Sequence, residues 1–282
     1  MATASTDMSS PTRSSTPRLG VSLHCIGKPV DGGLLKALQD SQVATLELYP
    51  LLFTEENLAA RTALRVAMMT KGIRAATVHA RFGGKIDVSS LDDGIRAQGL
   101  AAWREAMDMA VEFDAGMVVV HPSAEPIPDA EREARIARSV RMLESLADDA
   151  RELGLRFAVE LLPRTCLGRS AAELLRLLDG LDPAVFGACL DVNHLMDRPQ
   201  TVPDAVRELG SRLFTLHLSD YDGIDEKHWP PGQGVIGWPA FMQALRDIGY
   251  TGPFNYEANF PGDTPAQRFA ALQDNFRWLG AL

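Results

Sequence analysis

The chain has 282 residues, of which 46% are hydrophobic and 23% charged, a composition typical of a globular protein with one large domain or two small ones. Its formal net charge of −9 makes nucleic acid a poor default partner, because an acidic surface repels phosphate backbones. Three widely spaced cysteines argue against a disulfide framework, and no apolar run approaches the roughly 20 residues that a membrane helix needs. We therefore expect a cytoplasmic protein that does not associate with a membrane.

The chain begins with a stretch rich in Ser, Thr and Pro, residues 1–18, that lacks an apolar core. This composition does not fit a secretory signal and is typical of a disordered tail. Residues 19–282 are predicted to form a single catalytic domain.

After this tail, eight short apolar runs of strand length follow one another along the chain. They occupy residues 19–25, 43–49, 74–80, 116–122, 155–161, 186–192, 212–220 and 253–259. Amphipathic segments of helical period lie between them, most clearly at 92–116 and 129–154. This strict alternation predicts a parallel sheet covered by helices, and eight units in about 260 residues match an α/β fold with a single (β/α)8 TIM barrel. The alternative is an open doubly wound sheet, which the lack of a G-x-G-x-x-G motif after the first strand disfavours.

Six successive predicted strands, from the third to the eighth, end in a side chain that can carry a charge or bind a metal ion. These are His79, His121, Glu160, Asp191, His217 and Glu257. The carboxyl ends of barrel strands meet at one mouth, where barrel enzymes carry their active sites, so we expect all six side chains in one pocket. His24 and Glu47 end the first two strands and are equally consistent with pocket walls and with structural hydrogen bonds.

Carboxylates gathered in one pocket raise one another's pKa unless a cation neutralises them. Three carboxylates and one imidazole form a ligand set that suits a divalent metal ion. The predicted ligands are Glu160, Asp191, His217 and Glu257. We expect one tightly held ion, with Mn²⁺ favoured and Mg²⁺, Co²⁺ or Zn²⁺ as alternatives.

Two further histidines, His194 and His228, lie in the loops just after the sixth and seventh strands. The second of these loops is rich in Pro and Gly, which predicts a tight loop that holds His228 over the mouth of the barrel.

Seven short segments carry a resemblance to a known family. They read VHARF, VVVHPS, AVEL, CLDVNHL, LHLSD, HWPPGQGVIGW and YEANF. With them the chain resembles the xylose-isomerase-like barrels, which include sugar and sugar-phosphate isomerases and epimerases, inosose and dehydroshikimate dehydratases, and apurinic endonucleases. The resemblance extends over nearly everything after residue 18 and implies an enzyme of carbohydrate metabolism.

The resemblance also implies roles for individual residues. It implies that the four predicted ligands bind one metal ion and that His194 and His228 contact substrate oxygens. His228 stands where ketose 3-epimerases have Arg. Pro163 and Cys166 replace an Asn and a Glu of those epimerases, which argues against 3-epimerisation of a free ketohexose.

We expect a divalent-metal-dependent isomerase or epimerase that acts on a sugar, keto-sugar or sugar phosphate through a metal-stabilised enediolate. Glu160 and Glu257 are the predicted catalytic pair that removes and returns the proton. The predicted substrate-binding residues are His79, His121, Arg164, His194 and His228. The expected partner is a small carbohydrate rather than nucleic acid or a membrane, and a homo-oligomer is left open.

Two alternatives use the same residues. A keto-polyol dehydratase of the inosose or dehydroshikimate type would take the same first step and then expel a β-hydroxyl. A zinc-dependent phosphodiesterase like the apurinic endonucleases would hold three zinc ions through nine ligands, the ninth of which is an Asp where this chain has Glu226. The other eight coincide with His79, His121, Glu160, Asp191, His194, His217, His228 and Glu257. The acidic charge and the lack of a loop rich in Lys, Arg and aromatic residues favour the sugar enzyme.

Overall fold

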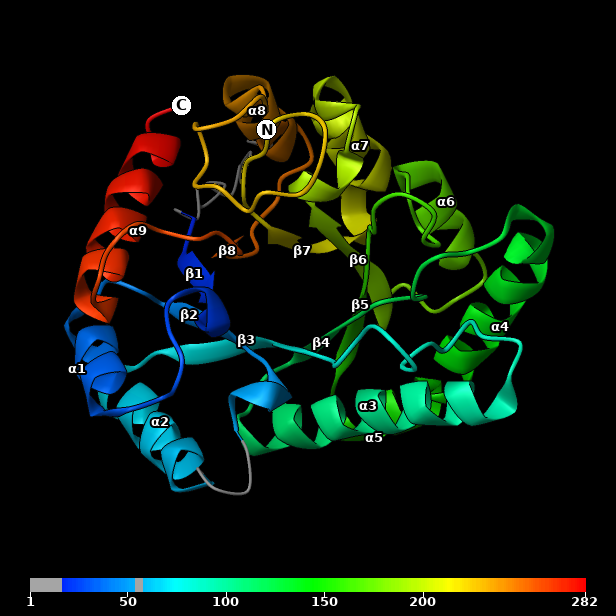
Figure 1. The fold of residues 1–282 in the computed structure, drawn as a ribbon, viewed down its shortest axis with the longest axis horizontal. Helices are drawn as coiled ribbons and strands as arrows, with labels where there is room; N and C mark the ends of the chain where they lie inside the picture. The colour runs from blue at the N-terminus through cyan, green and yellow to red at the C-terminus, as the bar shows by residue number, and fades with distance from the viewer. Residues whose placement is uncertain (1–16, 54–57) are drawn as a thin grey trace, which may run out of the picture.

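The computed structural model describes residues 17–53 and 58–282, where eight strands are surrounded by α-helices (Figure 1). The strands are β1 (Leu19–Ser22), β2 (Thr45–Leu48), β3 (Arg74–His79), β4 (Met117–Val120), β5 (Arg156–Glu160), β6 (Phe186–Asp191), β7 (Leu213–His217) and β8 (Phe254–Tyr256). The α-helices are α1 (Gly32–Asp40), α2 (Leu58–Lys71), α3 (Asp93–Glu112), α4 (Arg132–Ser145), α5 (Ala147–Leu153), α6 (Ala171–Leu177), α7 (Val202–Leu209), α8 (Trp238–Asp247) and α9 (Pro265–Gly280). The predicted disordered tail, 1–18, lies outside the described residues apart from its last two positions.

The sheet is parallel and closes into a barrel. Neighbouring strands pair in the order β7-β6-β5-β4-β3-β2-β1-β8. The seam between β7 and β8 is joined just beyond β7, where the Leu218 N–H donates to the Asn255 carbonyl at 2.8 Å. On the other side of this bridge, the Glu257 N–H donates to the Leu218 carbonyl at 3.1 Å. This closure confirms the predicted (β/α)8 TIM barrel and excludes the open doubly wound sheet.

Side chains of β4, β5 and β6 alternate between two hydrophobic clusters. In β4, Val118 and Val120 pack in the large core between the strands and the helices. A small separate cluster inside the barrel consists of Met117, Val119, Ala158 and Cys189. Side chains alternate with a period of two, so the residues two positions after Val119, Ala158 and Cys189 also point into the barrel. Those residues are His121, Glu160 and Asp191.

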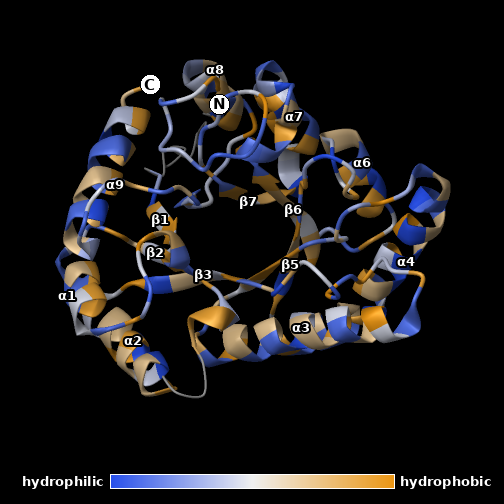
Figure 2. Ribbon diagram, viewed as in Figure 1, coloured by the Kyte–Doolittle hydropathy of each residue, from blue (hydrophilic) through white to orange (hydrophobic). Residues whose placement is uncertain are grey.

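The helices complete the outer layer of the barrel. Figure 2 shows mainly hydrophobic residues along the strands and a mixture of hydrophobic and hydrophilic residues on the helices. None of the helices in the described part of the chain combines the length and the apolar content that a membrane crossing requires.

Local signals in the sequence account for several helix ends. Asp31 and Asp92 each cap a helix, because the carboxylate accepts the N–H three residues later. Gly154 ends α5 in the left-handed conformation, with φ of 67°. The amphipathic segment predicted at 129–154 is divided into α4 and α5 at Leu146, whose φ of −104° and ψ of 1° interrupt the helix.

A tight contact inside the barrel provides a test of its packing. A methyl group on Gly187 in β6 would lie 2.5 Å from ring carbons of Phe214 in β7. We expect Gly187→Ala to lower the free energy of unfolding by about 1–3 kcal/mol, as overpacking of a core does. Urea denaturation measures this change.

Gly116→Ala is the matched control, because a methyl group there meets no heavy atom within 4 Å. It should change the free energy of unfolding by less than about 0.5 kcal/mol. Equal effects of the two substitutions would contradict the packing described for β6 and β7.

Candidate metal centre and substrate pocket

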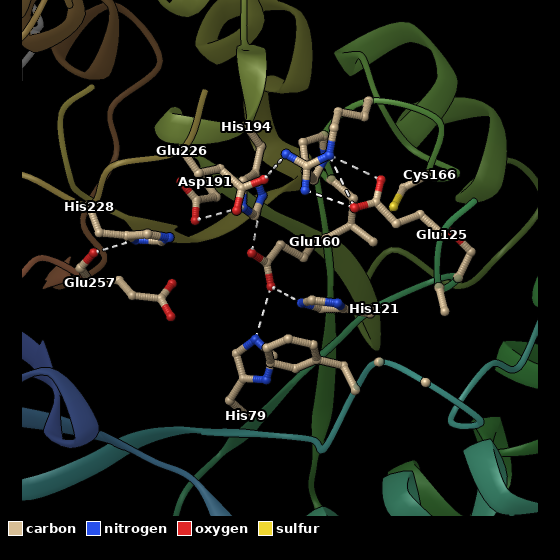
Figure 3. A pocket seen from close by; sticks show the side chains of 18 residues that line it. His79, His121, Glu125, Glu160, Cys166, Asp191, His194, Glu226, His228 and Glu257 are labelled. Carbon is tan, nitrogen blue, oxygen red and sulfur yellow. Dashed lines mark hydrogen bonds and ion pairs between the residues drawn. The ribbon is translucent and has the colours of Figure 1, made fainter. Parts of the chain in front are cut away.

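A cavity of about 300 Å³ opens at the carboxyl ends of the strands. Figure 3 shows side chains from successive strand ends converging on it. Its lining includes five of the six predicted strand-end residues, His79, His121, Glu160, Asp191 and Glu257. The sixth, His217, is fully buried and contacts three of them. The structure therefore brings all six side chains together.

Glu160, Asp191, His217 and Glu257 form what we call the central cluster. One ligand atom from each lies within 4.8 Å of the others. Nδ1 of His217 lies 2.8 Å from Oε2 of Glu257 and 3.3 Å from Oε1 of Glu160. Asp191 accepts the Asn193 N–H through Oδ1 at 2.7 Å, but its buried Oδ2 has no hydrogen-bond partner among the described residues. A buried carboxylate oxygen that lacks a donor and faces other ligand atoms fits a bound cation.

Burial and mutual attraction shift the pKa values of the central cluster. Burial would raise the pKa of Glu160 and of Glu257, but neighbouring imidazoles together lower both values. These are His217 and His121 at Glu160, and chiefly His217 at Glu257. Burial raises the pKa of Asp191 to about 6, against the attraction of a neighbouring imidazole. Burial would lower the pKa of His217, yet its ionisable neighbours raise it well above the usual value. The cluster thus requires a positive charge at its centre, which a proton on His217 or a metal ion can supply.

Glu47, at the inner face of β2, orients His217. Its Oε2 accepts the Nε2–H of His217 at 3.0 Å and the hydroxyl of Thr77 at 2.9 Å, and the side chain is fully buried. Burial would raise the pKa of Glu47, but His217 lowers it, so the carboxylate is ionised. This contact turns Nδ1 of His217 toward the central cluster. From the sequence alone, Glu47 has no firm role, and its position at the end of the second predicted strand is the only signal.

His79, His121 and Glu160 form a second group, the paired-histidine cluster. Nε2 of His79 and Nε2 of His121 lie 3.0 and 3.1 Å from Oε2 of Glu160. Nδ1 of His79 donates to the Ala80 carbonyl at 2.8 Å. Burial would lower the pKa of His79, but the hydrogen bond with Glu160 raises it to about 9, whereas burial lowers the pKa of His121. The ring of Phe82 stacks on that of His121, with centroids 4.0 Å apart.

His194, Glu226 and His228 form a third group, the outer cluster. Nδ1 of His194 donates to the Leu161 carbonyl at 2.8 Å, and its Nε2 lies 4.0 Å from Oε2 of Glu226. Nδ1 of His228 donates to the Glu257 carbonyl at 2.9 Å. These main-chain hydrogen bonds leave Nε2 as the atom that each ring can offer to a ligand.

The loop that carries Glu226 and His228 is organised by Asp220, which lies just after β7 and is fully buried. Its carboxylate accepts four hydrogen bonds of 2.9–3.2 Å, from the N–H groups of Tyr221, Gly232 and Ile236 and from the indole of Trp238. His228 itself adopts a left-handed conformation, with φ of 49°. The network holds the loop in the tight conformation that its Pro and Gly content predicts.

Arg164 lines the cavity, as a substrate-binding residue should, but its guanidinium already has acidic partners. It lies 2.8 Å from Glu125, 2.7 Å from Glu226 and 3.0 Å from Asp225. The hydrogen bond with Glu125 contributes most to a pKa of Arg164 above its usual value. Arg164 therefore joins the loops after β4, β5 and β7 within the protein itself.

Comparison with known proteins relates this barrel to sugar epimerases. L-ribulose 3-epimerase from Methylomonas sp. (strain DH-1) is 29% identical over 229 residues, which cover 79% of this chain and 72% of that protein. L-ribulose-5-phosphate 3-epimerase UlaE from Salmonella paratyphi A is 25% identical over 224 residues, which cover 78% and 76%. In three other curated relatives, the matched region spans only 63%, 38% and 58% of the relative's own length.

Solved structures show the same architecture. A crystal structure of a D-tagatose 3-epimerase-like protein has a TM-score of 0.76 and covers 94% of this chain and 98% of its own, at 20% identity. At that identity the likeness concerns the fold alone. The family model described as a xylose isomerase-like TIM barrel, however, matches residues 36–282. The chain therefore belongs to the xylose isomerase-like TIM barrel family.

Proposed function

We propose that this protein is a metal-dependent enzyme that isomerises or epimerises a sugar, a keto-sugar or a sugar phosphate. The observation that carries the proposal is the convergence of two glutamates, Glu160 and Glu257, around Nδ1 of one buried imidazole in a closed barrel mouth. The names of relatives that act on ribulose and ribulose 5-phosphate support sugar chemistry. A cavity of about 300 Å³ suits one small molecule.

The central cluster fits a divalent metal ion. Its donors are three carboxylates and one imidazole, and Oδ2 of Asp191 is buried without a donor among the described residues. The residues that would hold the ion are Glu160, Asp191, His217 and Glu257. Mn²⁺ is the favoured ion for this donor set, with Mg²⁺, Co²⁺ or Zn²⁺ as alternatives. When bound, such an ion supplies Lewis-acid polarisation of adjacent carbonyl and hydroxyl oxygens.

Glu160 and Glu257 are the proposed acid–base pair. Both have pKa values below the usual range because neighbouring imidazoles together outweigh their burial, so each carboxylate is ionised at neutral pH and available to accept a proton. One glutamate removes the proton from the carbon beside the substrate carbonyl. The other glutamate, protonated from solvent, delivers a proton to the opposite face of that carbon and so inverts the configuration of the carbon. Return of the proton to the carbonyl carbon would interconvert ketose and aldose.

The histidines around the pair are proposed to hold the substrate. The proposed substrate-binding residues are His79, His121, Arg164, His194 and His228. In three of these histidines Nδ1 donates to a main-chain carbonyl. Nε2 is then the atom left to meet sugar hydroxyls, and neutral imidazole can donate or accept.

Two other activities remain as alternatives. A keto-polyol dehydratase shares the proton removal and differs only in the loss of a β-hydroxyl. A zinc-dependent phosphodiesterase gains support from one observation, namely that the central, paired-histidine and outer clusters are three candidate metal groups side by side. We rank it lower because the net charge of −9 opposes binding to DNA.

We propose a small carbohydrate, and no nucleic acid, as the partner of this site, and a cytoplasmic location. All three cysteines are free thiols, which accords with a reducing compartment. A homo-oligomer is compatible with this function.

Exchange of substrate hydrogen with solvent tests the proposed reaction directly. Protein loaded with Mn²⁺ is incubated in deuterium oxide with a panel of keto-sugars, inososes and sugar phosphates, and NMR locates deuterium on carbon. We expect incorporation beside the carbonyl in at least one compound class. If stoichiometric protein left the whole panel unlabelled, the proposed proton transfer would be rejected.

Two variants separate the roles within the site. Glu257→Gln should reduce exchange by at least about 100-fold and weaken metal binding, because it removes both a base and a charged ligand. His194→Ala should raise KM and leave the metal bound, because it removes a substrate contact. Loss of the metal from His194→Ala as complete as from Glu257→Gln would contradict this division.

Glu47 should affect metal affinity without touching the metal. Glu47→Gln removes the charge that orients His217, so the affinity for Mn²⁺ should fall by about 10–100-fold in a direct titration. Thr77→Val is the control, because it removes only the hydroxyl that also donates to Glu47. An unchanged affinity in Glu47→Gln, with the fold verified by circular dichroism, would show that Glu47 does not position His217.

Metal content distinguishes the sugar enzyme from the phosphodiesterase. We expect one tightly held divalent ion per chain after dialysis, because only the central cluster contains three carboxylates and Glu226 of the outer cluster is paired with Arg164. Elemental analysis of the purified protein gives the number. Close to three zinc ions per chain would overturn this expectation and make phosphodiester chemistry the leading proposal.

A further inference from the structure

Four histidines line the cavity, His79, His121, His194 and His228, but carboxylic acids outnumber the side chains with a permanent positive charge. Among the described residues that line it, five are carboxylic acids, Glu125, Glu160, Asp191, Glu226 and Glu257. The same lining contains one arginine, Arg164, and no lysine. Three of the carboxylates belong to the central cluster, where a divalent ion would offset their charge. The other two, Glu125 and Glu226, lie outside it (Figure 3). Both form ion pairs with Arg164.

Arg164 does not present a free cation to a ligand. Its Nε and Nη2 donate to Glu125 at 3.1 and 2.8 Å, and its Nη1 donates to Glu226 at 2.7 Å and to Asp225 at 3.0 Å. All three guanidinium nitrogens therefore already have carboxylate acceptors. Two of these carboxylates line the cavity themselves, so the outer part of the pocket remains negative even with Arg164 included.

A phosphorylated sugar would bring a negatively charged group to this acidic surface. A phosphate monoester carries a charge of about −2 at neutral pH and needs donors such as Arg, Lys or grouped main-chain N–H groups. To bind phosphate, Arg164 would have to leave Glu125 and Glu226 and expose both carboxylates to the ligand. Like charges placed together are disfavoured even where the side chains are 25–42% exposed, which gives discrimination by repulsion.

We propose that the substrate of this site is an uncharged sugar or keto-polyol, and that Glu125 and Glu226, by engaging Arg164, exclude phosphorylated and carboxylated analogues. This inference rests on the proposed sugar chemistry and restricts its substrates to compounds without a charged group. Hydroxyl groups suit the same surface, because a sugar O–H can donate to either glutamate without adding negative charge. Glu125 and Glu226 are specificity-determining residues in this view, and Arg164, besides lining the pocket, holds both carboxylates in place.

Matched pairs of compounds test the inference. Deuterium exchange and binding are measured for D-ribulose and D-ribulose 5-phosphate, and for D-fructose and D-fructose 6-phosphate, with Mn²⁺-loaded protein. For any pair that reacts, we expect kcat/KM for the free sugar to exceed that for its ester by at least about 100-fold, equivalent to about 2.7 kcal/mol. An ester that reacts as well as its parent sugar, or better, overturns the inference.

Binding separates failure of this inference from failure of the proposed function. If no compound exchanges, the proposed reaction fails, but calorimetry with the same pairs and with inorganic phosphate still reports the charge preference. Binding of inorganic phosphate or of an ester more tightly than the free sugar would contradict exclusion of anions. Weaker binding of the esters would support it independently of catalysis.

Charge variants test which residues are responsible. Glu125→Gln removes one acidic partner of Arg164, so the ratio of ester to free-sugar affinity should rise by about tenfold or more. Glu133→Gln is the matched control, because Glu133 pairs with Arg176 on the outer surface and does not line the cavity. It should leave the ratio unchanged. An unchanged ratio in Glu125→Gln, or an equal rise in both variants, would show that Glu125 does not set the specificity.

Discussion

The buried imidazole of His217 holds together the charges on which the rest of the pocket depends. Glu47 contacts its Nε2, and Glu160 and Glu257 approach its Nδ1. Removing a carboxylate from water costs several kcal/mol unless an opposite charge or a hydrogen bond compensates. A positive charge at this point therefore stabilises the barrel mouth, and the same carboxylates make the mouth suited to a cation.

Two further residues organise the loops above this centre, one as a hydrogen-bond acceptor and one as a donor. Asp220 collects four N–H donors and so fixes the long loop that carries His228. Arg164 collects three carboxylates and so joins the loops after β4, β5 and β7. Groups held by packed neighbours can act on a substrate without first being ordered, which lowers the entropic part of a reaction barrier. A small cavity between such loops is suited to one bound molecule in one orientation.

Glu160 explains why one ligand arrangement is compatible with different chemistries. It takes part in both the central and the paired-histidine clusters, so the same carboxylate would be shared if both clusters held a metal ion, and would be free to act as a base if only one did. The outer cluster adds a third group, but its Glu226 also binds Arg164. The choice between proton transfer on a sugar and attack on a phosphodiester therefore depends on charge balance and metal loading rather than on the types of ligand present.

The sequence by itself determined the barrel and the membership of the strand-end group, because both follow from local periodicity. Alternation with a period of two places His121, Glu160 and Asp191 inside the barrel, and parallel closure brings their strand ends to one mouth. Only the tertiary structure decided what these groups meet. Glu47 contacts His217 across 170 positions, and Arg164 reaches acids 39 and 62 positions away. Such contacts depend on strand register and on loop conformations that no periodicity encodes, so the acidic partners of Arg164 could not be predicted from the sequence.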